Sequence, residues 1–498
     1  MANKMLVESD PHETRIAVLE EDRLTELYLE RSHHRGLVGN VYKGRVTRVL
    51  PGMQAAFVDV GLERDAFLYV ADVATAEPPE LDAELHNDEL PEPAVVVAGP
   101  SIDALLKAGQ ELLVQVTKDP LPNKGARVTT HVTLPGRFLV LLPSVGHLGV
   151  SRRIEDEAER TRLRALLESL PPEGGGLIVR TAGEGRAEEE FRADLDYLLG
   201  LWRRLREGAE LVGAPALVHQ DFDLALRVVR DRLSPDFSVL WVAGEETYAR
   251  IVEFLDQVQP ALLPRVKLDR EERGLFERFG IENAIDAALK PKVWLPSGGY
   301  LVINPTEALV AIDVNTGRYV GRSNLEETAL ATNLEAVVEV VRQIRLRDLG
   351  GIIVVDFIDM VEPEHREQLF AALERELAKD RAKYKVLAIS EFGLVEITRE
   401  RSRANLERLL TSSCPYCEGS GRIVSAATTG LKIRRAALRL AGTTAPRELM
   451  IRVHPEVARS LRCEDPAILD ELERELATRI LVQEDATIHR ASFDILEV

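Results

Sequence analysis

Two aspartates in the middle of the chain have the type and spacing needed to bind a divalent cation together. Asp313 follows the apolar residues 310–312, and Asp356 follows the apolar residues 352–355. Apolar runs this short, bounded by Gly or Pro, are typical of buried strands. Asn315 adds an amide oxygen two residues after Asp313. Carboxylate and amide oxygens are ligands that Mg²⁺ prefers in proteins.

The residues between the two aspartates predict the element that would bring them together. Residues 323–326 form a capping-box pattern, and apolar residues follow at helical spacing, namely Leu330, Leu334, Val337, Val341 and Ile344. Gly350 can end this helix. In a strand–helix–strand unit the two strands are parallel neighbours. Both carboxylates would then lie at one edge of a sheet, where α/β proteins place their sites.

An aspartate at a strand end that only caps the next turn is the simpler interpretation, and for one aspartate alone we favour it. Two aspartates on neighbouring strands, with Asn315 close by, favour a metal site instead. A Mg²⁺ ion there would polarise a phosphoryl oxygen and help to generate hydroxide from water.

The composition bounds the class of protein. The chain has 498 residues, enough for several domains, and no apolar run approaches the roughly 20 residues of a membrane span. The first ten residues lack the apolar core of a signal peptide, and three cysteines argue against a disulfide framework. We therefore expect a cytoplasmic protein that does not enter membranes.

The net charge of −19 does not exclude nucleic acid as a partner, because a local basic groove can still bind phosphate. Residues 77–93 carry much of the acid without any Lys or Arg, and we expect them to form a solvated loop.

Residues 36–128 predict a small β-barrel, with strands around residues 41–49 and 55–60 and a turn at 51–52. If Ala56 and Val58 point inward, Phe57 points outward. An outward Phe57 near Lys43, Arg45 and Arg48 could stack on a base, a contact worth about 1–3 kcal/mol, and Phe67 could do the same. Burial of both phenylalanines in the core is the alternative.

Arg180 and Thr181 follow an apolar strand at 177–179 and enter a turn that contains glycine. An Arg fork, a hydroxyl and free turn amides suit a terminal phosphate. From these residues alone, a solvated arginine at a strand end is the simpler interpretation.

Cys414 and Cys417 lie in the string CPYCEGSG. A redox site would need a helix that starts at the first cysteine, and Gly419 and Gly421 would break that helix. A zinc knuckle uses such glycines for tight turns, but structural zinc needs four ligands. Cys463 is far away in the sequence, so two chains that supply two cysteines each would complete the site.

Other segments give element predictions without a site. We expect a hairpin in residues 1–30, strands at 224–229, 238–242 and 385–389, and helices at 188–207, 245–257 and 363–378. Residues 449–453 and 480–482 predict strands, and 466–478 a helix. A basic run, namely Arg399, Arg401 and Arg403, could meet RNA phosphate or form a solvated helix face.

Several motifs together resemble the ribonuclease E/G family, in the order of the family and over essentially the whole chain. They are GNVYKGR at 39–45, QAAFVD at 54–59, NKGA at 123–126, AIDVNTG at 311–317, RLRDLGGIIVVDFIDM at 345–360 and CPYCEGSG at 414–421.

The resemblance implies a multidomain fold with α/β and α+β parts. Residues 36–128 would be an S1-type RNA-binding barrel of the OB class, inserted in a ribonuclease-H-like subdomain made of residues 1–35 and 223–290. Residues 129–222 would be a 5′-phosphate sensor and 291–410 a DNase-I-like catalytic domain. Residues 411–424 would form a zinc link and 425–498 a small C-terminal α/β domain.

The resemblance also implies residue roles. Asp313 and Asp356 would bind Mg²⁺ with help from Asn315, and Cys414 and Cys417 would bind Zn²⁺ shared between two chains. The remaining matched positions would contact RNA, namely Phe57, Phe67 and Lys124, or the 5′-monophosphate, namely Arg180, Thr181, Gly136 and Val140.

The activity implied is a single-strand-specific, Mg²⁺-dependent endoribonuclease that leaves 5′-phosphate and 3′-hydroxyl ends. Its substrates would be ribosomal-RNA precursors and messenger RNA, and the enzyme would be a homodimer that a second pairing could turn into a tetramer. A non-catalytic RNA-binding or assembly protein is the alternative, and the intact Asp313, Asn315 and Asp356 argue against it.

Overall fold

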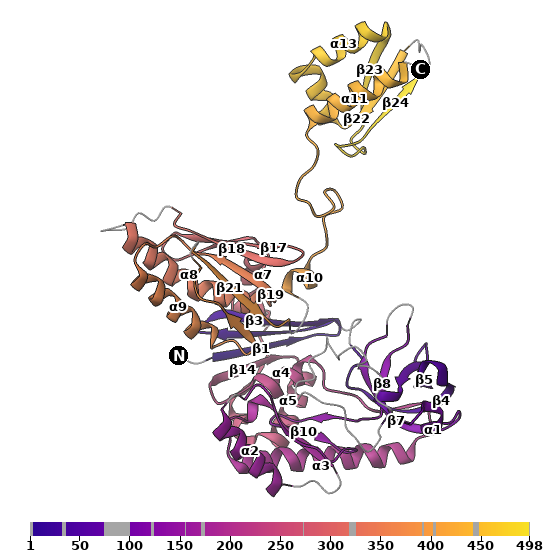
Figure 1. Ribbon diagram of the computed structural model, residues 1–498, viewed down its shortest axis with the longest axis vertical. Coiled ribbons are helices and arrows are strands. Elements are labelled where there is room, and N and C mark those ends of the chain that lie inside the picture. The colour runs from indigo at the N-terminus through magenta and orange to yellow at the C-terminus, as the bar shows by residue number, and fades with distance from the viewer. Residues whose placement is uncertain are drawn as a thin grey trace. The chain divides into compact units, whose positions relative to one another are not determined.

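The computed structural model describes residues 3–31, 36–73, 100–120, 124–154, 156–170, 175–271, 273–317, 325–390, 393–401, 405–441 and 448–497. The acidic segment 77–93, Ser323 and Asn324 of the predicted capping box, and Arg403 lie outside these residues. The chain divides into two compact units, Met1–Leu409 and Leu410–Val498 (Figure 1).

Two segments of the larger unit, residues 3–31 and 237–269, share a five-stranded sheet in the order β15-β14-β1-β2-β3. Its strands are β1 (Asn3–Ser9), β2 (Glu13–Glu20), β3 (Arg23–Arg31), β14 (Phe237–Ala243) and β15 (Val266–Asp269). The hairpin predicted in the first 30 residues is thus part of three antiparallel strands, and β14 runs parallel to β1. Helices α4 (Leu224–Arg232), α5 (Glu245–Val258), α6 (Leu275–Arg278) and α7 (Ile281–Ala288) follow in this region.

The strand predicted at 224–229 is wrong, because these residues begin α4. Asp223 caps this helix, since its carboxylate accepts from the N–H of Leu226 at 3.1 Å. The four apolar residues at 225, 226, 228 and 229 are buried in the core beneath the five-stranded sheet. The predictions for the strand at 238–242 and the helix at 245–257 are confirmed.

A five-stranded closed barrel stands between the two parts of that sheet in the sequence, as predicted. It is formed by β4 (Val41–Leu50), β5 (Ala55–Asp59), β6 (Ala66–Tyr69), β7 (Glu111–Lys118) and β8 (Arg127–Thr129). Pairing runs β4-β5-β6-β8-β7 and closes from β7 back to β4, while β13 (Ala216–His219) extends the sheet beside β4. A short helix, α1 (Ile102–Leu105), contributes Ile102 to the barrel core.

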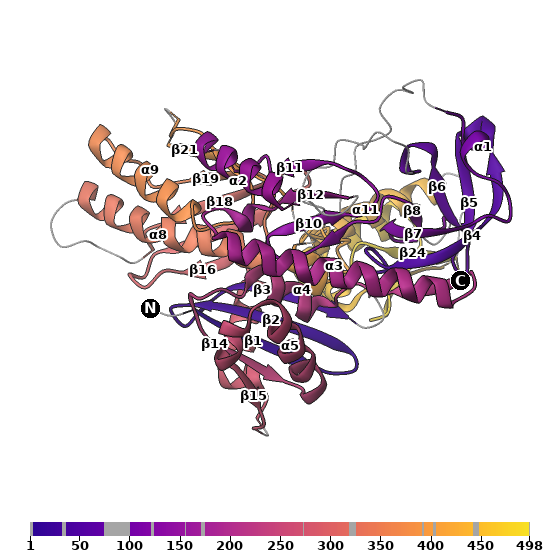
Figure 2. The same cartoon turned by 90° about the horizontal axis from the view of Figure 1, so that it is seen from below.

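A four-stranded sheet follows the barrel, in the order β11-β12-β10-β9. Its strands are β9 (Leu134–Pro135), β10 (Leu139–Leu142), β11 (Leu148–Val150) and β12 (Gly176–Val179), and α2 (Glu157–Ser169) precedes β12. The helix predicted at 188–207 is α3 (Glu188–Leu211), which runs from this sheet to the barrel (Figure 2).

The last part of the larger unit is a six-stranded sheet in the order β16-β17-β18-β19-β21-β20. Its strands are β16 (Lys292–Trp294), β17 (Tyr300–Pro305), β18 (Leu309–Asn315), β19 (Gly351–Asp356), β20 (Tyr384–Val386) and β21 (Leu394–Arg399). The strand predicted at 385–389 is thus shorter. Helices α8 (Leu325–Arg347) and α9 (Pro363–Leu377) pack side by side against one face, and α10 (Leu406–Leu410) follows the sheet (Figure 1).

Charged side chains join α8 to β2 and β3 and so connect the six-stranded sheet to the five-stranded one. Arg345 donates from Nη1 to Glu20 at 3.0 Å and from Nη2 to Glu26 at 3.1 Å. The second oxygen of Glu26 lies 2.7 Å from Nη2 of Arg232. Arg232 and Arg345 outweigh the effect of burial and lower the pKa of Glu26 to about 2.

The smaller unit contains a three-stranded sheet in the order β23-β22-β24, with β22 parallel to β23 and antiparallel to β24. Its elements are α11 (Ala426–Ala441), β22 (Glu448–Val453), α12 (Pro455–Arg459), α13 (Ala467–Leu476), β23 (Arg479–Glu484) and β24 (Phe493–Glu497). The strands and the helix predicted here are confirmed. Across the described parts of both units, no helix is long and apolar enough to span a lipid bilayer.

Candidate active site

Asp313 and Asp356 lie directly opposite each other on neighbouring strands. β18 and β19 run parallel, and the pairing register matches Asp313 with Asp356. Alternate residues of β18, Val310, Ile312 and Val314, are buried beneath α8, whereas both aspartates are exposed on the other face. The structure therefore brings together the two carboxylates that the sequence predicted to meet.

Asn315 completes this group. Its side-chain Nδ2 donates a hydrogen bond to Oδ2 of Asp313 at 2.7 Å, which fixes the rotamer of that carboxylate. Desolvation by burial, followed by the negative charges of Asp313 and Asp359, raises the pKa of Asp356. The two opposed carboxylates therefore repel each other, and a cation between them would relieve that repulsion.

The loop after Asp356 is fastened to α8. Asn333, fully buried in α8, donates from Nδ2 to the carbonyl oxygen of Ile358 at 2.8 Å and accepts from its N–H at 3.0 Å. The Glu326 carboxylate accepts from the N–H groups of Val361 and Glu362, each at 3.0 Å. Helix α8 thus fixes the position of the loop that follows Asp356.

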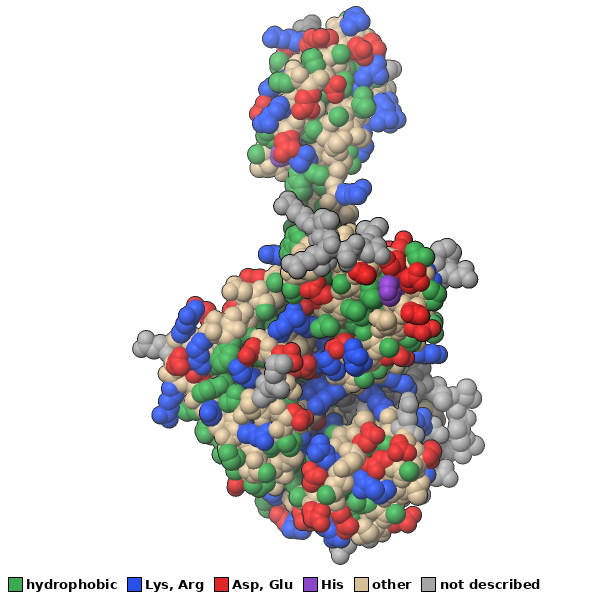
Figure 3. Space-filling model, turned by 90° about the vertical axis from the view of Figure 1, so that its left-hand side faces the viewer, with side chains coloured by type: hydrophobic (Ala, Val, Ile, Leu, Met, Phe, Trp, Pro, Cys, Tyr) green, Lys and Arg blue, Asp and Glu red, His purple; other side chains and the backbone are tan. Residues whose placement is uncertain are grey.

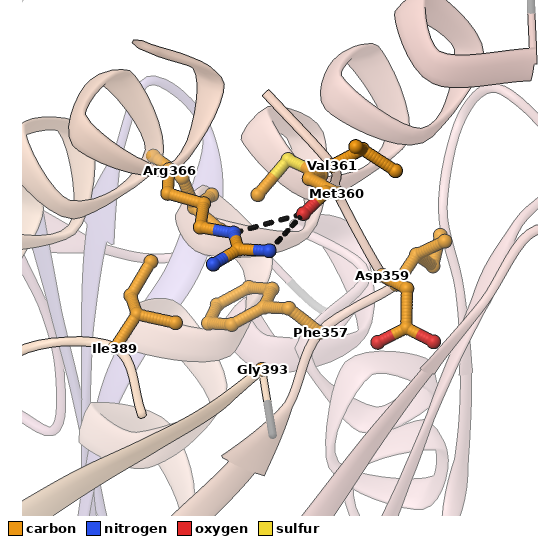
Figure 4. Close-up of a pocket in the computed structure, with 9 residues that line it drawn as sticks. Phe357, Asp359, Met360, Val361, Arg366, Ile389 and Gly393 are labelled. Atoms are coloured by element: carbon orange, nitrogen blue, oxygen red, sulfur yellow. Dashed lines mark hydrogen bonds between the residues drawn. The ribbon is translucent and has the colours of Figure 1, made fainter. Parts of the chain in front are cut away.

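A small pocket lies behind this loop and is lined mainly by apolar side chains. Arg366 closes one side, because its Nε and Nη2 donate to the carbonyl oxygen of Met360 at 2.8 and 2.6 Å (Figure 4). Asp359 lies at the rim of this pocket with its carboxylate directed away from Arg366 (Figure 4).

The residues present fit a Mg²⁺ ion better than an ion that needs a full protein cage. Among the described residues, no three His, Cys, Asp or Glu side chains lie close enough together to coordinate a metal ion by themselves. Magnesium usually binds through one or two carboxylates and completes its shell with water and substrate phosphate. The pair of Asp313 and Asp356, exposed on the open face of the sheet, has this form.

Arg399, the first residue of the basic run and the last of β21, matches neither interpretation of that run. Arg399 is buried and forms salt bridges with Asp348 and Asp380, both at 2.7 Å. It lies on a strand, so it is neither a free phosphate ligand nor part of a solvated helix face. No local pattern indicates this role, because the two partners of Arg399 are 51 and 19 residues away.

The barrel carries a row of aromatic side chains on its outer face. Ala56 and Val58 are fully buried, as the alternation predicted, whereas Phe57 is only partly buried. Phe57 pairs in register with Phe67, and their ring centroids are 5.5 Å apart. Burial of both rings in the core, the alternative interpretation, is therefore excluded.

Two further residues extend this row and were missed by the sequence analysis. Tyr69 lies two residues after Phe67 on the same face, with ring centroids 4.4 Å apart, and Arg127 lies 4.9 Å above the Tyr69 ring. The alternation of β6 could have revealed Tyr69. Lys124 is exposed just before β8, whose neighbour is Phe67. Lys43 and Arg45 instead pair with Glu111.

Arg180 and Thr181 lie where β12 ends, next to β10. Arg180 donates from Nη1 to Asp231 at 2.9 Å and to the carbonyl oxygen of Gly136. The Thr181 hydroxyl lies 3.2 Å from that of Ser151. Gly136 pairs with Leu139 at the turn before β10, and Val140 is buried on that strand. The structure therefore brings Arg180 and Gly136 into direct contact.

Two carboxylates, the half-buried Asp231 and the buried Asp194, support this group and were not recognised from the sequence. Asp231 accepts from Arg180 and Arg230, and these two guanidinium groups outweigh burial and hold the pKa of Asp231 far below its usual range. Asp194 accepts from three consecutive N–H groups at 137–139, at 3.0, 2.8 and 2.9 Å, although burial raises its pKa. Its position in an amphipathic helix gave no signal of this role.

Cys414 and Cys417 lie in a turn of the smaller unit, not at the start of a helix. Backbone N–H groups of Cys417 and Tyr416, with the Cys417 side chain, lower the pKa of Cys414. The N–H of Gly421 donates to the sulfur of Cys417 at 3.3 Å. The two thiols are near each other, and the Cys414 thiol is stabilised towards the thiolate, which suits a metal ligand pair. The turn lacks the helix start that a redox site needs.

Comparisons with known proteins match almost the whole chain. The family model described as Ribonuclease E/G family matches residues 133–402, and the model described as RNase E/G, Thioredoxin-like domain matches residues 413–498. The chain is 41% identical to Ribonuclease G of Haemophilus influenzae, over 99% of each chain, and 40% identical to Ribonuclease G of Escherichia coli (strain K12), over 100% of each. It is 37% identical to Ribonuclease E of Haemophilus influenzae, over 100% of this chain and 52% of the relative.

Proposed function

This chain belongs to the ribonuclease E/G family and is an endoribonuclease of that type, and on this premise we propose how it acts. We propose that it cuts single-stranded RNA with Mg²⁺ held by Asp313 and Asp356, and leaves 5′-phosphate and 3′-hydroxyl ends. The observation that carries this proposal is the register of β18 and β19, which sets the two carboxylates opposite each other on an exposed face.

Each residue of the group has a part in the proposed reaction. Asp313 and Asp356 would share the cation, and Asn315 holds the Asp313 carboxylate in position through its 2.7 Å hydrogen bond. When bound, Mg²⁺ would supply polarisation of a phosphoryl oxygen and acidification of a water molecule. The buried contacts of Asn333 keep the loop after Asp356 in place while the RNA backbone lies across the open face.

The proposed domains follow the sheets of the larger unit. The barrel would be the S1-type RNA-binding domain, and the sheet that joins residues 1–35 to 223–290 would be the ribonuclease-H-like subdomain. The four-stranded sheet would be the 5′ sensor, and the six-stranded sheet the DNase-I-like catalytic domain. Residues 411–424 would be the zinc link and 425–498 the C-terminal domain, and the thioredoxin-like family model matches residues 413–498.

The RNA would be held by stacking and by charge. Phe57 and Phe67 form a continuous aromatic surface with Tyr69. Lys124 is exposed shortly before Arg127, which pairs with Phe67. Basic side chains gather in a hollow of the larger unit, which supports binding of a phosphate backbone despite the net charge of −19 (Figure 3). We propose ribosomal-RNA precursors and messenger RNA as the substrates, in the cytoplasm.

Arg180 and Thr181 would bind a 5′-monophosphate, with Gly136 and Val140 as backbone partners. Arg180 is held in place by Asp231 and Gly136, so its remaining donors are oriented before RNA arrives. A preformed fork of this kind suits a phosphate. The enzyme would therefore favour RNA already processed to a 5′-monophosphate, because a bulkier triphosphate would fit poorly.

Cys414 and Cys417 would share one Zn²⁺ ion with the same pair of a second chain. Structural zinc needs four ligands, and the described part of one chain offers two cysteines close together. The hydrogen bonds to both sulfurs are of the kind that stabilises zinc-bound thiolates. We propose a zinc-linked homodimer that could pair further into a tetramer.

The test is cleavage of a short, 5′-monophosphorylated single strand with Mg²⁺, followed by identification of the new ends. Wild type should cut it and leave 5′-phosphate and 3′-hydroxyl ends, while Asp313→Asn should not. Equal cleavage by both proteins, or products with other ends, would reject the proposed reaction.

A further inference from the structure

An aromatic pair, the exposed Trp294 and the half-buried Tyr300, lies at the edge of the six-stranded sheet and has no part in the site described so far. Trp294 on β16 is 63% exposed, an unusual exposure for so large an apolar side chain. Its ring lies 5.3 Å from that of Tyr300 on β17, centroid to centroid, at an interplanar angle of 62°. Nζ of Lys292 lies 4.1 Å from the Trp294 centroid and 3.5 Å from the Tyr300 centroid.

The pairing register connects this pair to the two aspartates. Trp294 pairs with Tyr300, and Tyr300 pairs with Asn315. Two residues before Trp294 on β16, Lys292 pairs with Val302. Val302 pairs in turn with Asp313, and Asp313 with Asp356. Residues directly opposite each other in neighbouring strands project from the same face of a sheet. The aromatic pair, Lys292 and the carboxylates therefore share the open face. Trp294 and Lys292 lie two strands from Asp313, and Tyr300 lies one strand from it.

The turn between β16 and β17, just after Trp294, is held against α8 and against Gly317. The N–H of Ser297 donates to Glu335 of α8 at 3.1 Å. Gly298 and Gly317 both have positive φ, +96° and +63°. A Cβ on Gly317 would approach the carbonyl oxygen of Gly298 to 2.3 Å, so only glycine fits there. The aromatic pair is thus fixed relative to the proposed catalytic group rather than carried on a loose loop.

These features are better explained by binding of a nucleotide than by protection of the sheet edge against pairing with another strand. A lysine alone would discourage edge-to-edge pairing, whereas an exposed tryptophan next to it would not. Single-stranded nucleic acid binds where bases stack on aromatic rings and phosphates meet positive charge. Trp294 offers a ring for stacking, and the neighbouring Lys292 offers the positive charge. Both lie on the face where the phosphodiester would lie.

We propose that Trp294 and Tyr300, with Lys292, form a stacking platform for a base of the RNA next to the bond that is cut. The proposal rests on the proposed function, because it places the RNA across the face that carries Asp313 and Asp356. Trp294 would hold the substrate in register with the catalytic group and would take no part in the chemistry itself.

The test is steady-state cleavage of a 5′-monophosphorylated single strand by Trp294→Ala, with Trp294→Phe and Trp241→Phe as controls. We expect Trp294→Ala to raise KM about tenfold with little change in kcat, since stacking contributes to binding. Trp294→Phe keeps a ring and should stay within about twofold of wild type, as should Trp241→Phe on the distant strand β14. An unchanged KM for Trp294→Ala would overturn the proposal.

A substrate with one abasic nucleotide beside the cleaved bond makes the test specific for stacking. For wild type, KM for the abasic substrate should be about tenfold higher than KM for the intact substrate. For Trp294→Ala the two substrates should have the same KM, because the stacking contact needs both the base and the ring. Independent effects of the two changes would overturn the platform. So would a lower molecular mass of Trp294→Ala with unchanged RNA affinity, which would make this face a contact between copies of the chain.

Binding without cleavage separates this proposal from the nuclease mechanism. In Asp313→Asn, titration with the same RNA should quench the tryptophan fluorescence, and the quenching should be lost in Asp313→Asn combined with Trp294→Ala. Quenching without any cleavage by wild type would keep the platform and reject the nuclease mechanism. Cleavage by wild type without quenching would keep the nuclease mechanism and reject the platform.

Discussion

At the scale of single residues, the raised pKa of Asp356 is the feature that connects geometry with chemistry. Partial burial and the nearby charges of Asp313 and Asp359 all favour the neutral form of this carboxyl group. A divalent cation favours the charged form, so protons and metal compete for the same oxygens. Cleavage that depends on this group should therefore need more Mg²⁺ as the pH falls.

Arg180 allows the 5′ sensing to be tested apart from the chemistry. We expect Arg180→Gln to reduce cleavage of a 5′-monophosphorylated strand about tenfold, because it removes a charge-assisted phosphate contact worth about 1.5–3 kcal/mol. Cleavage of the same strand with a 5′-hydroxyl should not change. Competition between the two strands measures the preference directly.

Arg192→Gln is the matched control, because Arg192 is an exposed arginine of the same region that pairs with Glu188 on α3. An unchanged preference in Arg180→Gln, or an equal loss in Arg192→Gln, would contradict the proposed sensor.

The sequence predicted some residues of the sites and missed others for a physical reason. Asp313 and Asp356 could be predicted because each ends an apolar run and the helix between them forces parallel strands. Asp231 and Asp194 could not, because Arg180 and the backbone N–H groups at 137–139, to which they bind, are far away in the sequence and nothing local distinguishes these carboxylates from solvated ones. Arg399 failed for the same reason.

At the scale of elements, α8 is the support of the proposed active site. It covers the buried side of β18 and β19, and its polar residues reach the loop after Asp356. Asn333 is the central one, since its amide pairs with both backbone groups of Ile358. A helix could be predicted here from its apolar spacing, but this buried amide could not.

Asn333→Ala should uncouple the loop from the helix. We expect it to lower the free energy of unfolding by about 1–3 kcal/mol, because two backbone groups lose their partner. It should also lower kcat about tenfold, because a displaced Asp356 misaligns the site. Urea unfolding and steady-state cleavage measure the two effects.

Asn333→Asp keeps the acceptor for the Ile358 N–H and loses only the donor, so it should lie between wild type and Asn333→Ala. A large loss of stability in Asn333→Ala with an unchanged kcat would show that the loop does not position Asp356.

The strand predicted at 224–229 shows the limit of periodicity at this scale. Short apolar runs are compatible with either a strand or a buried helix segment. In the structure these residues form α4, and Asp223 caps this helix. An aspartate just before the apolar run was the sequence signal that favoured a helix.

At the scale of the whole molecule, Glu26 connects three elements within the larger unit, β3, α4 and α8. Its folded pKa of about 2 lies below its ordinary value of 4.5. A depressed pKa stabilises the fold above the unfolded value, and that stability is lost as the pH falls from about 4.5 towards 2.

We therefore expect Glu26→Gln to destabilise the larger unit by about 3–5 kcal/mol at pH 7, because Arg232 and Arg345 lose the charge between them. The difference from wild type should shrink towards pH 3. Hydrogen exchange of the β3 amides at both pH values measures it, and a difference that stays constant with pH would contradict the assigned ion pair.

The zinc link is a prediction about assembly. Cys414→Ser should release zinc and shift the molecular mass in solution towards smaller species, because it removes a ligand from each chain. Cys463→Ser, at the third and exposed cysteine, is the control and should change neither. Light scattering and metal analysis provide the readouts, and unchanged mass and zinc in Cys414→Ser would reject the link.

Assembly of the sheets from distant segments is the part of the fold that the residues alone could not predict. Nothing in the periodicity of residues 3–31 indicates that they pair with β14, more than 200 residues later. The alternation in 36–128 predicted a barrel but not which strands close it, namely β7 on β4. Long-range pairings of this kind are fixed by packing of the whole unit, and the family resemblance was the only sign of them beforehand.

The central claim is that two carboxylates set opposite each other by β18 and β19 bind one Mg²⁺ ion that RNA cleavage requires. Its most direct test is the Mg²⁺ dependence of cleavage of a 5′-monophosphorylated single strand by wild type, Asp313→Asn, Asp356→Asn and Glu396→Gln. Glu396 is an exposed carboxylate of the neighbouring strand β21, paired with Val354, and serves as the matched control. We predict that wild type and Glu396→Gln saturate alike, and that both aspartate variants fall by more than about a hundredfold, beyond the usual cost of a change outside the metal ligands. Cleavage by either aspartate variant at the wild-type rate and Mg²⁺ concentration would contradict the claim.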